Sequence, residues 1–153
     1  MNLEDEACST QMPAQRKYLP TIADLIDRLS ISLMKSIFID RDIYRPEMSM
    51  IMDDIASCLN DTKIAATPAG HAALIYYCLV LMLSNRYIWE NEAVARKSGK
   101  GGRLLATHSV NGVRNRAKNE ISKHFGERID HKIDCLAAEL PTECGDWRVF
   151  DND

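Results

Sequence analysis

The side chains best suited to chemistry lie on one stripe of the segment 104–125. Alternating steps of three and four residues place them on one face of a helix: His108, Asn111, Asn115, Lys118 and Ser122. Arg114 and Asn119 lie beside this stripe. Asparagine lowers helix propensity by roughly half a kcal/mol, so several on one face indicate fixed hydrogen bonds. The face could bind phosphate, a nucleotide or a sugar-phosphate, or it could form a polar network with other helices.

A glycine-rich loop precedes the stripe. Three glycines fall between Ser98 and Arg103. The backbone amides of this loop, with Lys100 and Arg103, could receive an anion, although the segment lacks the spacing of a Walker motif. A flexible linker whose charges aid solubility is the alternative. The loop and the stripe together give the predicted ligand-binding residues: Lys100, Arg103, His108, Asn111, Arg114, Asn115 and Lys118.

Charge is divided unevenly along the chain. The segment 96–132 holds ten Lys and Arg residues against three acidic ones, a net charge of +7. The whole chain has a net charge of −3, so the remaining residues carry −10. Such a division favours an anionic small molecule or an acidic protein surface as the partner. Nucleic acid is the less favoured partner, because the rest of the chain is strongly acidic and no nucleic-acid-binding motif is present.

Catalytic and metal-binding motifs are sparse. The all-α nucleotide pyrophosphatases carry E-x-x-E on one helix and E-x-x-D on another, whereas Glu90 and Glu92 are two residues apart and point to different faces. The four histidines form neither H-x-x-x-H nor H-E-x-x-H. The sequence therefore predicts no catalytic residue, no metal and no cofactor. The enzyme alternative is a site for a phosphorylated or nucleotide substrate, assembled from His108, Arg86 and Asp134 across helices.

The element expected to organise the others is a helix over residues 68–96. Thr67 followed by Pro68 is typical of a helix start, and every residue from Ala72 to Leu83 is apolar. A helix that is apolar on all sides must be surrounded by protein or by lipid. The apolar run is shorter than the roughly 20 residues that span a bilayer, so we expect a central core helix and no membrane span.

Other helices are expected around this one. The segment 21–38 begins at Thr21, with Asp24 three residues on as a capping partner. Its predicted buried stripe is Ile22, Leu25, Ile26, Leu29, Leu33 and Ile37. Further helices are predicted over about 46–59, 104–125 and 128–140, with Gly126 as a C-cap. The apolar line predicted for the segment 104–125 is Val110, Val113, Ala117, Ile121 and Phe125. The sequence predicts an all-α, single-domain bundle of about five helices over residues 20–153, after a flexible lead at 1–19. A structural or oligomeric component, with an apolar patch that includes Trp89 or Trp147, is a third functional alternative.

Five cysteines without a C-x-x-C pair fit a reducing compartment better than a disulfide framework. The acidic N-terminal segment has no apolar stretch typical of a signal peptide. A cytoplasmic protein is therefore expected.

Two segments, Thr21–Ile31 and Lys132–Ala137, resemble uncharacterised small helical proteins of phages and bacteria, and the stretch His108–Ile121 shares this likeness. The resemblance implies an all-α fold and a phage setting but no activity. In that setting the protein could inhibit a host defence system in the host cytoplasm. The function predicted from the sequence is a non-catalytic binding protein that uses the basic face of residues 100–124, with homo-oligomerisation as an open alternative.

Overall fold

The computed structural model of this chain describes residues 18–61, 67–98 and 104–130. Within these ranges the chain forms four helices and no strand: α1 (Ile22–Phe38), α2 (Arg41–Asp61), α3 (Pro68–Ser98) and α4 (Leu104–His124). The predicted all-α class is confirmed. The fifth predicted helix, over 128–140, lies mostly outside the described residues, and residues 127–130 are not helical.

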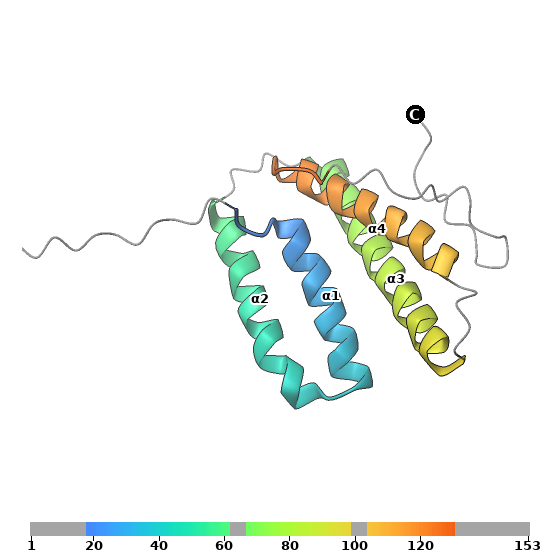
Figure 1. Cartoon of the computed structure of the whole chain (residues 1–153). Helices are drawn as coiled ribbons and strands as arrows, with labels where there is room; N and C mark the ends of the chain where they lie inside the picture. The colour runs from blue at the N-terminus through green and yellow to red at the C-terminus, as the bar shows by residue number, and fades with distance from the viewer. Residues whose placement is uncertain (1–17, 62–66, 99–103, 131–153) are drawn as a thin grey trace, which may run out of the picture.

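The helices form two antiparallel pairs, α1 with α2 and α3 with α4 (Figure 1). Helix α1 joins the pairs, because it packs against α3 and α4 as well as α2. The hydrophobic core lies between α1, α3 and α4. Its buried residues are Ile22, Ala23, Val80, Leu81, Val113, Ala117, Ile121 and Phe125. The apolar line predicted for the fourth helix is buried along its whole length.

Local signals set the ends of three helices as expected. Thr21 caps α1, and its side chain and that of Asp24 bond reciprocally to each other's backbone amides at 3.1 and 3.0 Å. The Thr67 hydroxyl accepts from the Gly70 amide at 3.1 Å at the start of α3. Gly126 ends α4 with a φ of 65°, a left-handed conformation that glycine adopts without strain.

The prediction for the start of the second helix was wrong. Helix α2 begins at Arg41, so Pro46 lies inside it and not at its first position. The Asp40 carboxylate accepts from the amides of Asp42 and Ile43 at 2.8 and 3.2 Å, and this cap allows the helix to start early. Proline so near the start removes only one intrahelical bond, to the carbonyl of Asp42.

The structure does not confirm a third helix enclosed on all sides. One side of α3 packs against α4 and α1, where Val80 and Leu81 are buried. The opposite side carries large apolar side chains that are 46–62% exposed: Ile75, Tyr76, Leu79 and Leu83. Among the described residues, α3 is the one helix whose length and apolar composition would also allow it to cross a membrane.

Candidate functional site

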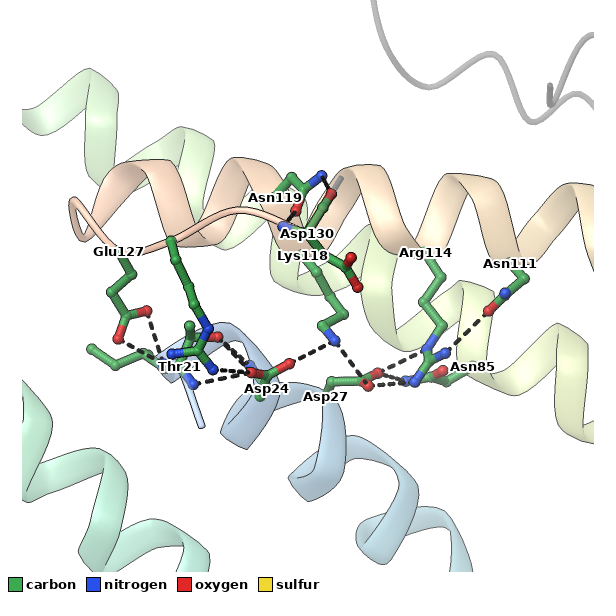
Figure 2. A network of polar contacts seen from close by, with 12 residues as sticks. Thr21, Asp24, Asp27, Asn85, Asn111, Arg114, Lys118, Asn119, Glu127 and Asp130 are labelled. Atoms are coloured by element: carbon green, nitrogen blue, oxygen red, sulfur yellow. Dashed lines mark hydrogen bonds and ion pairs between the residues drawn. The ribbon is translucent and has the colours of Figure 1, made fainter. Parts of the chain in front are cut away.

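A buried carboxylate joins three helices. Asp27 of α1 is only 6% exposed, although aspartate usually lies at the protein surface. Its Oδ1 accepts from Nε of Arg114 on α4 at 3.0 Å and from Nδ2 of Asn85 on α3 at 2.8 Å. Its Oδ2 accepts from Nη2 of the same arginine (Figure 2). A buried charge needs a partner and satisfied hydrogen bonds, and Asp27 has both.

A second ion pair lies one helical turn away. Asp24 of α1 accepts from Nζ of Lys118 on α4 at 2.7 Å, and Arg128 lies 3.7 Å from the other carboxylate oxygen. Burial raises the pKa of Asp24, but the bonds from Lys118 and Thr21 together lower it more, so this pKa lies below its usual value of 3.8. We call the two pairs, Asp24–Lys118 and Asp27–Arg114, the charge ladder (Figure 2).

A third contact fastens the chain after α4 to the start of α1. Both carboxylate oxygens of Glu127 accept from the Ile22 amide, at 3.0 and 2.9 Å (Figure 2). The free amides at a helix start carry partial positive charge, which favours a carboxylate there. Burial nevertheless raises the pKa of Glu127, helped by repulsion from Asp24. Asn119 exchanges two hydrogen bonds with the backbone of Asp130 and holds the same segment beside α4.

Next to the charge ladder lies an open cavity of about 690 Å³, which we call the groove. It is formed by the C-terminal halves of α1 and α3, with one residue from α4. Its lining is Ile31, Met34, Lys35, Ile39, Asn85, Ile88, Trp89, Glu92, Ala93, Arg96, Lys97 and Arg114. An apolar interior with a few convergent polar groups is typical of a small-molecule site.

The cations of the groove have different environments. Arg114 is bound to Asp27, so its charge is largely neutralised within the protein. Arg96 pairs with Glu92 at 3.0 Å, but both side chains are more than half exposed, and such pairs contribute little in water. The Lys35 ammonium lies 5.4 Å from the centre of the Tyr44 ring. Lys97 is exposed at the end of α3. Three of the four cations therefore lie where an anion could reach them.

The predicted site residues are only partly brought together. Arg114 and Lys118 face α1 and pair with its carboxylates, and Asn111 accepts from Nη1 of Arg114 at 3.0 Å. Asn115 is half-buried and His108 is exposed. Lys100 and Arg103 lie outside the described residues. The sequence left open a polar network with other helices as the alternative to a ligand site. Such a network accounts for Arg114, Lys118 and Asn111.

The residues that sequence reasoning missed are Asp27, Asn85, Trp89 and Lys35. A signal was present for the first two. Asp27 follows Leu25 and Ile26 in a helix that buries apolar residues, and Asn85 lies two residues after the apolar run that ends at Leu83, so both would need polar partners if buried. For Trp89 and Lys35 no local signal exists. They come together because the C-terminal halves of α1 and α3 lie side by side.

The enzyme alternative named His108, Arg86 and Asp134, and the structure leaves it untested. Arg86 pairs with Glu90 at 2.5 Å and stacks on the Phe38 ring at 4.3 Å, while Asp134 lies outside the described residues. The described residues also contain no group of three or more His, Cys, Asp or Glu placed to hold a metal ion.

Comparison with known proteins adds no assignment. No protein-family model matches the sequence, and neither the curated proteins nor the solved structures include a match. The resemblance to small helical proteins of phages and bacteria therefore stays a prediction.

Proposed function

We propose that this protein binds, without transforming it, an anionic small molecule that has an apolar or aromatic part, and that the groove is the site. The observation that carries the proposal is the combination of an apolar interior with cations from separate helices at one cavity. Apolar surface alone would accept many ligands, and surface cations alone would bind anions weakly. The two together favour a ligand that has both properties.

The acidic group of the ligand is expected at the other cations of the groove and not at Arg114. Arg114 already has Asp27 as its partner, and separating them would leave a buried carboxylate unpaired. Lys35 from α1 and Lys97 from α3 both line the groove. Arg96 can exchange Glu92 for a ligand anion at little cost, because that pair is exposed.

The apolar part of the ligand is expected against Trp89. Its ring lines the groove together with Ile31, Met34 and Ile88. A flat ring system can stack on an indole, so a nucleotide fits these walls better than a sugar-phosphate, which has no apolar face of comparable size. The cavity volume of about 690 Å³ lies in the range usual for small-molecule sites.

Trp89 also provides the assay. The chain has two tryptophans, so Trp147→Phe leaves Trp89 as the only tryptophan, which can be excited selectively at wavelengths that tyrosine does not absorb. We would titrate this variant with nucleotides, sugar phosphates and inorganic phosphate, and record emission and thermal unfolding. A ligand at 100 times its Kd should add about 2.7 kcal/mol of apparent stability. A nucleotide should shift the emission, and inorganic phosphate should shift it least.

The double variant Lys35→Ala/Lys97→Ala should weaken nucleotide binding by about tenfold or more, equivalent to about 1.4 kcal/mol. The control, Arg41→Ala/Lys123→Ala, removes the same charge from exposed positions outside the groove and should bind normally. Equal weakening in both variants would indicate a non-specific charge effect and would refute the groove as the site. No response to any member of the panel would refute a small-molecule ligand and leave an acidic protein surface as the partner to test.

A further inference from the structure

The outward side of α3 is apolar over its first half. Ala72, Tyr76, Leu79 and Leu83 follow one another at spacings of four, three and four residues, which is the repeat of a helix-pairing seam. Ile75 lies beside them, and all five side chains are exposed. The core contacts of the helix, such as Leu81, lie on the opposite side.

The second half of the same side is polar. One and two turns beyond Leu83 it presents Arg86 and Glu90, which pair with each other at 2.5 Å. The outward side of α3 is therefore apolar only as far as Leu83, and beyond it the side chains are charged. A contiguous exposed apolar patch with a polar border is typical of a protein interface.

We propose that this patch pairs with the same patch of a second copy of the chain, with the two α3 helices antiparallel and crossing at Leu79. In such a twofold arrangement Leu79 contacts its own counterpart, and Leu83 contacts Ile75 of the other copy. The same geometry brings Glu90 to the first turn of the other α3. The first turn of α3 contains no acidic residue that could balance the partial positive charge of the helix start. Glu90 of the other copy would supply the missing carboxylate.

Charge also selects the antiparallel orientation. A parallel pair would place Glu90 beside Glu90 and Arg86 beside Arg86, which is unfavourable. No charged side chain occurs from Pro68 to Asn85, so the antiparallel pair brings no like charges together in its apolar part. The patch is thus complementary to itself in one orientation only.

A lipid bilayer fits the patch less well than a second copy. The other side of α3 holds Asn85, which donates to the buried Asp27, and α4 with its ion pairs packs along it. Insertion of α3 into a bilayer would bring these charges into hydrocarbon or break their bonds, and either is costly. A protein surface can cover the apolar side and leave the rest of the fold unchanged.

The test is the mass of the full chain in solution, by sedimentation equilibrium and by light scattering after size exclusion. We expect a dimer at tens of micromolar protein. Leu79→Glu should weaken dimerisation at least 100-fold and give a monomer, with the same far-UV circular dichroism because this side chain is exposed. Val94→Glu is the matched control, since Val94 is an exposed apolar residue of α3 beyond the patch, and it should stay dimeric.

Glu90→Lys tests the orientation and should weaken the dimer about tenfold, because it places a cation at the positive end of the other helix. A monomeric wild-type chain at 100 µM would overturn the proposal, as would a dimer that Leu79→Glu and Val94→Glu disturb equally. Open-ended larger assemblies would overturn the twofold arrangement. Co-sedimentation with phosphatidylcholine–phosphatidylglycerol vesicles that is lost in Leu79→Glu would assign the patch to lipid instead.

Discussion

Replacing Asp27 by alanine tests whether the charge ladder stabilises the fold. The side chains of Asp27 and Arg114 are 8% and 23% exposed, so the pair is largely removed from water. Loss of the carboxylate leaves Arg114 without its main acceptor and Asn85 without one of its two. Breaking a buried pair from one side costs about 3–5 kcal/mol, and the partial exposure of Arg114 places the expected loss near the lower end, about 3 kcal/mol.

That loss should appear in urea unfolding followed by circular dichroism at 222 nm, and as a Tm lower by about 6–12 °C. Arg28→Ala is the control, because its pair with Glu47 is exposed and should contribute at most about 1 kcal/mol. The double variant Asp27→Ala/Arg114→Ala should lose less unfolding free energy than the two single variants lose in sum, because it leaves neither charge of the pair without its partner. The reasoning is refuted if Asp27→Ala loses no more stability than Arg28→Ala.

Two further predictions concern the start of α1. The pKa of Asp24 lies below its usual value of 3.8, so its ionised form stabilises the fold above about pH 4, and this contribution is lost as the pH falls through the lower, folded-state pKa. Wild type should therefore exceed Asp24→Asn in urea stability at pH 7, and the difference should shrink as the pH is lowered below about 4; a difference independent of pH would contradict this. Glu127→Ala removes the acceptor for the Ile22 amide and should cost about 1 kcal/mol in the same assay. Glu120→Ala, which removes a surface pair with Lys123, should cost clearly less, and equal losses would argue against a cap by Glu127.

The sequence was sufficient for features that depend on neighbouring residues. The caps at Thr21 and Gly126 follow from a hydroxyl before a helical pattern and a glycine after one, and both are present. The buried line of α4 follows from apolar residues at helical spacing. Such signals act within a few residues and need no knowledge of the tertiary structure.

Features that depend on the placement of whole helices were beyond the sequence. The apolar stripe predicted for α1 included Leu33 and Ile37, yet both are exposed, while Asp27 and Ser30 are buried. Periodicity counts apolar residues and cannot show that a polar one has a partner 87 positions away. The groove likewise exists because two helices from different pairs lie side by side, which no local pattern encodes.

The charge ladder also aligns α1 with α4 along their length. The two helices run antiparallel, so Asp24 meets Lys118 and Asp27 meets Arg114 in the observed register, with Lys118 also 4.0 Å from Asp27. A slip by one helical turn, about 5.4 Å, would place Asp27 opposite Lys118 and leave Arg114 without a carboxylate opposite it. Apolar packing alone would tolerate such a slip far better. The charge ladder therefore favours the observed register of α1 against α4 over a slipped one.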